Sequence, residues 1–221
     1  MSTESSHKTG AHTVPMSFEL FDKETNLPQG LADDLKLYVA LLEKWQRQIN
    51  LVSKATLEDV WNRHILDSLQ IYPLIPDTAK TVVDLGSGAG FPGLVLALFS
   101  KAYGGPEVHL VEADSRKCAF LKEVNSQTTA GAVIHERRVE SITELKTDVV
   151  TARALAPLRK LLKLAVRFEA GDTTYIFLKG EKAQEELTEA QKDWTMTVQG
   201  TPSRTLAAAT IFTLKGVTRR A

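Results

Sequence analysis

The sequence contains little cysteine and no apolar run long enough to cross a lipid bilayer. Its one cysteine, Cys118, excludes an internal disulfide framework and a zinc site built from several cysteines, and it suits a reducing, cytoplasmic location. A membrane-spanning helix needs roughly 20 apolar residues, so we expect no membrane span. The first 15 residues lack the apolar core of a secretory signal, and we interpret them as a polar tail.

An excess of charge of one sign is also missing, because 27 basic residues balance 27 acidic ones. The charges are nevertheless spread unevenly, since residues 151–221 carry 12 basic and 7 acidic side chains. The densest part, residues 151–168, contains five basic residues and no acidic one. This stretch is either the solvated face of a helix or part of a surface that contacts phosphates.

At 221 residues the chain can form one main domain with a short additional element. We expect residues 1–30 to be a polar, partly disordered lead-in, residues 31–78 an N-terminal helical subdomain, and residues 79–221 the main domain. Within the subdomain, apolar residues recur at three- and four-residue spacing, which predicts two amphipathic helices. The second of them is predicted to start with Thr56 as its N-cap and to end near Tyr72.

From residue 81 onward, strand-type and helix-type segments alternate. This order is typical of an α/β fold in which a doubly wound, mostly parallel sheet has helices on both faces. Two late segments rich in strand-forming residues, 194–200 and 209–216, have no helix between them. We therefore expect an antiparallel pair at one end of the sheet.

Four glycines lie in the segment VVDLGSGAGFPG, residues 82–93, directly after a predicted strand. Gly86, Gly88 and Gly90 would let the chain turn sharply and let a ligand approach the backbone closely. Ligands of open α/β sheets bind at such loops, beyond the carboxyl ends of the strands. Residues 88–93 also match the G-x-G-x-x-G pattern of dinucleotide-binding proteins, so a nicotinamide cofactor is one candidate and S-adenosylmethionine is another.

Two carboxylates help to choose between these cofactors. Asp84, at the end of the predicted strand, would oppose a diphosphate but would suit the ammonium of S-adenosylmethionine, with exposed backbone N–H groups for the rest of the ligand. Glu112, at the end of the next strand, can accept hydrogen bonds from the ribose hydroxyls of either cofactor. We favour S-adenosylmethionine and keep a nicotinamide-dependent oxidoreductase as an alternative.

Several segments together resemble a known family. They are DLGSGAGFPG, LVEADSRKCAFL, RRVE and TARA, preceded by INLVS and WNRHILDSL. They are similar to the bacterial small-subunit rRNA guanine-N7 methyltransferases, also called the glucose-inhibited division protein B family, over about residues 30–180. The resemblance implies a seven-stranded, Rossmann-like class I methyltransferase fold with S-adenosylmethionine as cofactor. It also implies a guanine of 16S rRNA near the decoding centre as acceptor, presented in a small ribosomal subunit or its precursor.

The resemblance assigns roles to individual residues. Together with the glycine loop itself, which indicates Asp84 and Gly88, it gives the expected cofactor-binding residues: Asp84, Gly86, Gly88, Phe91, Glu112, Val139, Glu140 and Arg153. Within this set, Val139 and Glu140 would flank the adenine, and Arg153 would lie at the mouth between cofactor and RNA. Arg63 and His64, on the segment WNRHILDSL, would position the guanine or its phosphate, whereas their spacing alone is typical of structural or surface residues.

The chemistry of the reaction agrees with what the sequence lacks. Guanine N7 carries a lone pair and no proton in the neutral base, so its methylation needs an in-line approach and an unstacked base but no general base. The sequence has no N/D-P-P-Y/F motif for methylation of an amino group, and Cys118 is predicted to lie away from the reaction mouth. We therefore assign no catalytic residue and no metal. A non-catalytic rRNA-binding or assembly factor is a second alternative.

Overall fold

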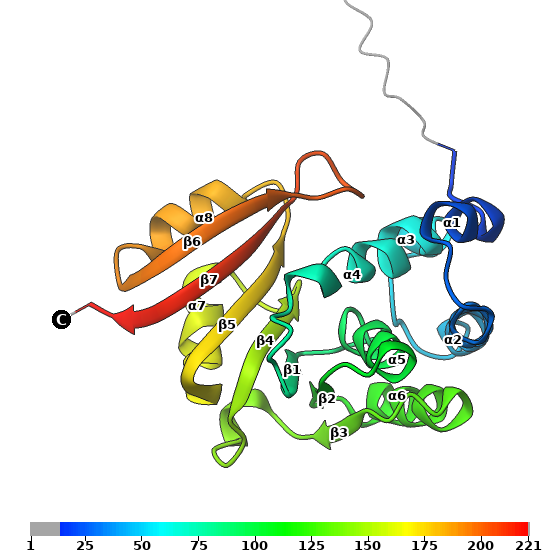
Figure 1. The fold of residues 1–221 in the computed structure, drawn as a ribbon, viewed down its shortest axis with the longest axis horizontal. Helices are drawn as coiled ribbons and strands as arrows, with labels where there is room; N and C mark the ends of the chain where they lie inside the picture. The colour runs from blue at the N-terminus through cyan, green and yellow to red at the C-terminus, as the bar shows by residue number, and fades with distance from the viewer. Residues whose placement is uncertain (1–13, 221) are drawn as a thin grey trace, which may run out of the picture.

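A computed structural model describes residues 14–220, so residues 1–13 of the predicted polar lead-in lie outside the described range. A central sheet has helices on both of its faces (Figure 1). The helical elements are α1 (Phe18–Thr25), α2 (Gln29–Gln46), α3 (Lys54–Leu57), η1 (Trp61–Leu66), α4 (Asp67–Leu69), η2 (Tyr72–Leu74), α5 (Gly93–Tyr103), α6 (Ser115–Thr128), η3 (Val139–Ser141), α7 (Leu158–Ala165), η4 (Val166–Phe168) and α8 (Ala183–Ala190).

Seven strands form one sheet in the order β3-β2-β1-β4-β5-β7-β6. They are β1 (Thr81–Leu85), β2 (Glu107–Glu112), β3 (Val133–Glu136), β4 (Thr147–Arg153), β5 (Glu169–Lys179), β6 (Trp194–Pro202) and β7 (Thr210–Arg219). The first five strands pair in parallel, whereas β7 is antiparallel to both β5 and β6. The doubly wound, mostly parallel α/β class is therefore confirmed, and so is the antiparallel end of the sheet.

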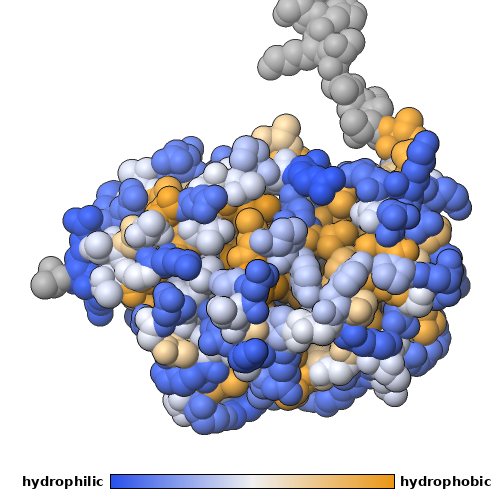
Figure 2. All heavy atoms as spheres, viewed as in Figure 1, coloured by the Kyte–Doolittle hydropathy of each residue, from blue (hydrophilic) through white to orange (hydrophobic). Residues whose placement is uncertain are grey.

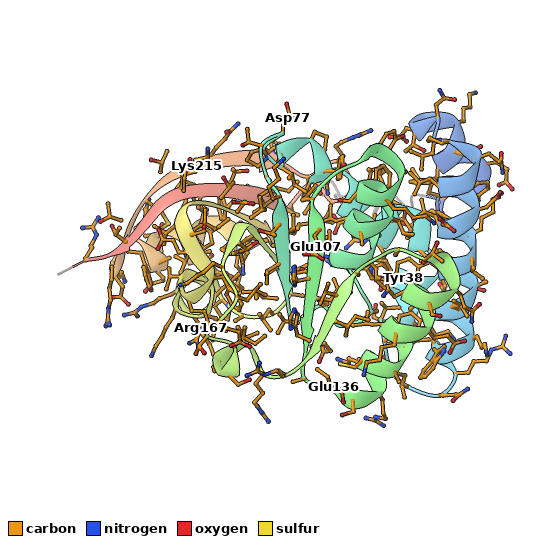
Figure 3. The ribbon with its side chains drawn as sticks, turned by 60° about the horizontal axis from the view of Figure 1, so that its bottom comes forward. Tyr38, Asp77, Glu107, Glu136, Arg167 and Lys215 are labelled. Carbon is orange, nitrogen blue, oxygen red and sulfur yellow. The ribbon has the colours of Figure 1, made fainter. Side chains whose placement is uncertain are left out.

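The sheet separates two clusters of buried apolar side chains. Consecutive residues of β1 serve different faces, because Val82 belongs to the cluster under α2, α5 and α6 and Val83 to the cluster under α7 and α8. Strands that are buried on both faces have nearly continuous apolar sequences, which is why the strand segments of this protein are rich in valine and leucine. Figure 3 shows the helices of the first cluster, α2, α5 and α6, on one side of the strands.

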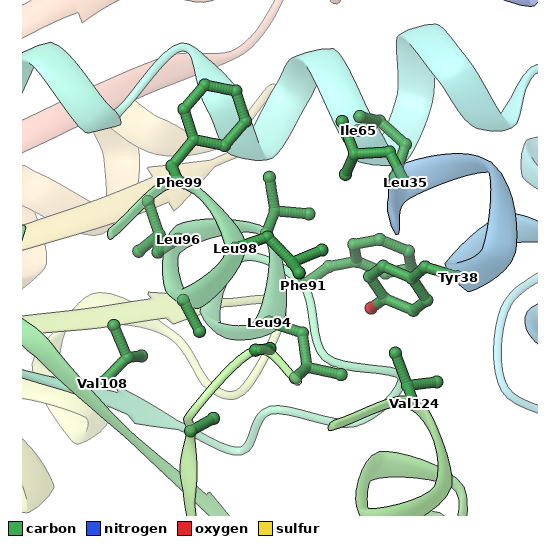
Figure 4. Close-up of a cluster of buried hydrophobic side chains, with 14 of the residues drawn as sticks. Leu35, Tyr38, Ile65, Phe91, Leu94, Leu96, Leu98, Phe99, Val108 and Val124 are labelled. Atoms are coloured by element: carbon green, nitrogen blue, oxygen red, sulfur yellow. The ribbon is translucent and has the colours of Figure 1, made fainter. Parts of the chain in front are cut away.

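The N-terminal helices share the first of these clusters with the sheet. Leu35 and Tyr38 of α2 and Ile65 of η1 pack with Phe91 and Leu94, at the start of α5 (Figure 4). The segment predicted as a helical subdomain thus contributes side chains to the same apolar cluster as the segment predicted as the main domain. Outside this packing, polar side chains predominate on the face in Figure 2, with hydrophobic ones showing between them.

The second predicted helix is divided into short pieces, and its predicted cap is wrong. Ser53 caps α3, because its side chain accepts the N–H of Thr56 at 3.2 Å. A π-helical stretch, η1, follows after a turn, and the N–H of Asp67 reaches back to the carbonyl of Asn62. Single π-helical turns inserted in helices are frequent at functional sites, and η1 carries the two residues predicted to position a guanine.

Candidate functional site

A cavity of about 380 Å³ lies over the glycine loop that joins β1 to α5. Gly86 and Gly88 have φ angles of 67° and 58°, a region that residues with a Cβ enter only with strain. Together with Glu112, Val139 and Glu140 they line this cavity, which we call the loop pocket. The fold thus brings together five of the predicted cofactor-binding residues.

Most backbone N–H groups of the loop are engaged within the protein, whereas the sequence predicts a loop whose N–H groups are open to a ligand. The N–H groups of Gly86 and Ser87 both donate to the carbonyl of Val111, at 2.9 and 3.1 Å. The N–H of Gly88 donates to Oε2 of Glu112 at 2.9 Å, and Oε1 of Glu112 accepts two further backbone N–H groups. Because a diphosphate relies on free N–H donors, this loop favours a ligand without one.

Asp84 lies beneath the loop and not at its edge, so it does not line the loop pocket as predicted. The side chain is fully buried. Its Oδ2 accepts the N–H of Gly93 at 3.2 Å, and its Oδ1 accepts the hydroxyl of Thr151 at 3.0 Å. Burial raises the pKa of Asp84 to about 6, in opposition to the hydrogen bonds that favour the ionised form. The carboxylate therefore ties β1 to α5 and β4.

Asp84→Asn should remove a pH-dependent loss of stability. Because the folded-state pKa lies above the ordinary value of 3.8, ionisation opposes folding, and this effect is absent below about pH 4 and complete above about pH 6. Between pH 4 and pH 7 the wild-type protein should lose on the order of 3 kcal/mol of stability relative to the variant. Urea unfolding of both proteins at the two pH values measures the difference, and parallel pH dependences would contradict the expectation.

A second cavity, of about 730 Å³, adjoins the loop pocket. Its lining includes Arg63 and His64 from η1 and Arg153 from the end of β4, and we call it the arginine pocket. Three residues predicted to act on the RNA side thus line one cavity. Thr56, whose role as a helix cap the structure corrects, lies in the same lining.

A short segment, residues 154–156, lines both pockets and forms the wall between them. Ala154 has a φ of 55°, which is unusual for a residue with a Cβ. The side chain of Leu155 covers Gly86, since a Cβ placed on Gly86 would lie 2.6 Å from Cδ1 of Leu155. Leu155 is also one of the few large apolar side chains that remain exposed, at 36%.

Arg153 connects the wall to η1 and to the start of α4 through three hydrogen bonds. Its guanidinium donates to the carbonyl of Arg63 and to Oδ2 of Asp67, both at 3.0 Å, and to Nδ1 of His64 at 2.8 Å. The side chains of Arg153 and Asp67 are only 18% and 16% exposed, so this ion pair is shielded from water. The guanidinium also lies 5.2 Å from the centre of the Phe91 ring, within cation–π range.

His64 is a neutral side chain with a free hydrogen-bond donor. Burial, followed by the charge of Arg153, lowers its pKa to about 3. Because Nδ1 accepts from Arg153, the proton is on Nε2, which has no partner among residues 14–220. The ring stacks on Phe91 with the ring centres 4.7 Å apart, and Phe91 stacks in turn on Tyr38 (Figure 4). Phe91 therefore supports the arginine pocket and does not line the loop pocket, where we expected it.

Two residues outside every predicted motif complete the site. Thr205, in the loop between β6 and β7, donates to Oδ1 of Asp67 at 2.6 Å. Lys179, at the end of β5, donates to the carbonyl of Ala156 at 2.9 Å and pairs with Glu186 at 2.7 Å, which holds the wall in place. A lysine that ends an apolar strand segment is the one sign of Lys179 in the sequence, and no local pattern indicates Thr205.

The one cysteine lines neither pocket. The thiol of Cys118 donates to the carbonyl of Glu112 at 3.4 Å, and burial raises its pKa to about 11, so it is protonated at neutral pH. Within residues 14–220, no three His, Cys, Asp or Glu side chains are arranged to hold a metal ion. No helix in the described part of the chain has both the length and the apolar character needed to cross a membrane.

Comparison with known proteins identifies the family. The family GidB, described as rRNA small subunit methyltransferase G, matches residues 31–209. Curated proteins named ribosomal RNA small subunit methyltransferase G are similar to the chain. The protein of Rhodospirillum rubrum is 49% identical, over 86% of this chain and 92% of its own length. The protein of Paramagnetospirillum magneticum is 50% identical, over 84% of this chain and 88% of its own length. The fold is similar to that of an O-methyltransferase from Bacillus cereus in complex with SAH, with a TM-score of 0.54, 12% identity and coverage of 88% of this chain and 95% of that one. The chain therefore belongs to the GidB family of rRNA small subunit methyltransferases.

Proposed function

We propose that this protein transfers a methyl group from S-adenosylmethionine to N7 of a guanine in 16S rRNA near the decoding centre. It would meet this RNA in the small ribosomal subunit or its precursor. The observation that carries the proposal is the pair of pockets that share the wall at residues 154–156, in a chain of the GidB family. One pocket offers space for a nucleoside cofactor, and the other offers space and donors for a flipped base.

The residues of the loop pocket fit S-adenosylmethionine. Gly86 and Gly88 allow a ligand to approach the backbone closely, and Glu112 is oriented by three backbone N–H groups to accept the ribose hydroxyls. Val139 and Glu140 would flank the adenine. When bound, S-adenosylmethionine supplies a methyl group that its sulfonium makes electrophilic. A nicotinamide dinucleotide is disfavoured because its diphosphate would meet N–H groups that are already engaged.

The residues of the arginine pocket would position the acceptor base. The buried N–H at Nε2 of His64 would donate to the base, and Arg153 would stand at the mouth between cofactor and RNA. Arg63, on the same stretch, would contact a phosphate of the flipped nucleotide. Guanine N7 offers its lone pair without losing a proton, which agrees with a histidine whose low pKa makes it a poor base at neutral pH.

Transfer of a labelled methyl group tests the proposed reaction directly. Small ribosomal subunits from cells without this protein should incorporate label from S-adenosylmethionine, and mapping should place it at N7 of one guanine of 16S rRNA. A non-catalytic rRNA-binding factor would bind the subunits and incorporate no label. Calorimetry would separate the nicotinamide alternative, because only one of the two cofactors should bind.

The double substitution Arg63→Ala/His64→Ala should reduce kcat/KM for the ribosomal substrate by about a hundredfold, because the base or its phosphate loses its donors. S-adenosylmethionine should still bind, since neither side chain lines the loop pocket. Asn62→Ala is the control on the same π-helical stretch, because within residues 14–220 the side chain of Asn62 bonds only to Asp59 and lines neither pocket. An unchanged methylation rate and an unchanged RNA affinity in the double variant would refute the assigned roles.

A further inference from the structure

A third hollow, of about 880 Å³, runs along the exposed face of α7, and we call it the α7 groove. It is formed by α7 and the ends of neighbouring strands of the sheet. Its lining includes Pro157, Arg159, Lys160 and Lys163 from α7 and its start, and Arg219 from the end of β7. The inward side of α7 is apolar, so its basic residues all face solvent along the groove.

The cations of the α7 groove are mostly free of acidic partners. Arg159 is engaged, because it binds Asp193 at 2.5 and 2.9 Å. Lys160, Lys163 and Arg219 form no ion pair within residues 14–220, although Glu169 also lies in the lining. The lining thus carries four cations against two carboxylates, Asp193 and Glu169, and this excess of positive charge complements a polyanion better than it stabilises the fold.

The α7 groove adjoins both pockets of the functional site. Pro157 lines the groove and the arginine pocket, and Lys160 lines the groove and the loop pocket. The linings of all three hollows therefore come together at the start of α7. An RNA strand whose guanine enters the arginine pocket would leave that pocket at one end of a basic groove.

We infer that the α7 groove binds the sugar–phosphate backbone of the rRNA that flanks the target guanine. Lys160 and Lys163 are three residues apart on one helix, so they present neighbouring charges to successive phosphates, and Arg219 adds a third charge further along. This inference rests on the proposed function, which makes an rRNA the substrate. It favours phosphate contact over a merely solvated helix face for the basic stretch 151–168, because the lysines of that stretch lie along a groove that borders the site.

The full-length variant Lys163→Gln/Arg219→Gln tests the inference, because both residues line the α7 groove and neither lines the other two pockets. The measurement is the affinity for unmodified small ribosomal subunits across a series of KCl concentrations. At physiological salt the affinity should fall about tenfold, and the slope of log K against log salt should become shallower by about 0.7 to 0.9 for each phosphate that the variant no longer neutralises. The affinity for S-adenosylmethionine should not change.

Lys23→Gln/Lys44→Gln is the matched control, because it removes the same charge from exposed side chains on the N-terminal helices α1 and α2. Its RNA affinity and salt slope should stay close to those of the wild type. If both double variants lost RNA affinity equally, the loss would be due to the change in net charge alone, and the inference would be overturned. Unchanged affinity in the groove variant would also overturn it, as expected if the groove instead received an acidic protein segment.

Two further measurements allow a clear outcome of the binding experiment. If the double variant folds poorly, the single variant Lys163→Gln on the exposed face of α7 should lose about threefold in affinity and about half of the change in salt slope. Binding is measured without methyl transfer, so the two proposals fail separately. Wild-type protein that binds subunits in a groove-dependent way but transfers no methyl group would refute the proposed reaction and leave this inference standing.

Discussion

Arg153→Ala is expected to lower kcat/KM for methylation at least about a hundredfold and to destabilise the protein by about 3 kcal/mol. The loss of activity follows from geometry, because Arg153 holds the carbonyl of Arg63 and the ring of His64 in place beside the wall. Misplacement of a positioned group by about 1 Å is enough for an effect of this size. The loss of stability follows because Asp67 would keep a shielded charge without its partner.

The two effects can be separated by measurement. Steady-state methylation should be assayed at a temperature at which urea unfolding shows the variant to be fully folded. Arg159→Ala is the matched control for stability, since its ion pair with Asp193 is exposed and should contribute less than about 1 kcal/mol. Arg153→Lys should recover part of the stability but little of the activity, because an ammonium cannot make the same set of planar hydrogen bonds. Activity within about twofold of wild type in Arg153→Ala would contradict the role of this residue.

Gly93→Ala is expected to destabilise the protein by about 3 kcal/mol, although alanine normally stabilises a helix. Gly93 is the first residue of α5, where the helix presses on the sheet. A Cβ at this position would lie 2.2 Å from Cδ2 of Leu110 and 2.7 Å from Oδ2 of Asp84. Both neighbours are fully buried, so neither can move aside without disturbing the sheet. Urea unfolding at pH 7 measures the change.

Gly30→Ala is the control, because Gly30 is also near the start of a helix but has no neighbouring atom within 4 Å of the position that a Cβ would take. There the substitution should stabilise the protein by roughly 0.5 to 1 kcal/mol, since alanine loses less backbone entropy on folding. The same exchange should therefore have opposite signs at the two sites. Equal stability of Gly93→Ala and wild type would show that α5 can shift away from the sheet.

The pattern of the sequence was sufficient to predict the class of fold. Alternating strand and helix segments predicted the parallel sheet, and two late strands without a helix between them predicted its antiparallel end. The glycine loop and Glu112 were also expected to lie together, because both follow strands that end at the same edge of the sheet. These features depend on local patterns and on general rules of topology, so one sequence carries them.

Other features depend on side-chain directions and distant contacts that no local pattern encodes. A carboxylate at the end of a strand can face either a ligand or the underside of a helix. Asp84 faces the underside of α5, where it accepts the N–H of Gly93. Phe91 likewise turns into the stack with His64. Thr205 meets Asp67 across 138 residues of sequence, through a hairpin whose position only the folded sheet defines. The π-helical turn in η1 is a fourth case, since the sequence pattern of this segment predicts an ordinary amphipathic α-helix.

The wall at residues 154–156 has a consequence for inhibitor design. Because the same three residues bound both cavities, a compound that fills either of them would contact this wall. A bisubstrate molecule, with a nucleoside at one end and a purine at the other, would cross the wall beside Leu155, its one large side chain, in a segment that belongs to no helix or strand.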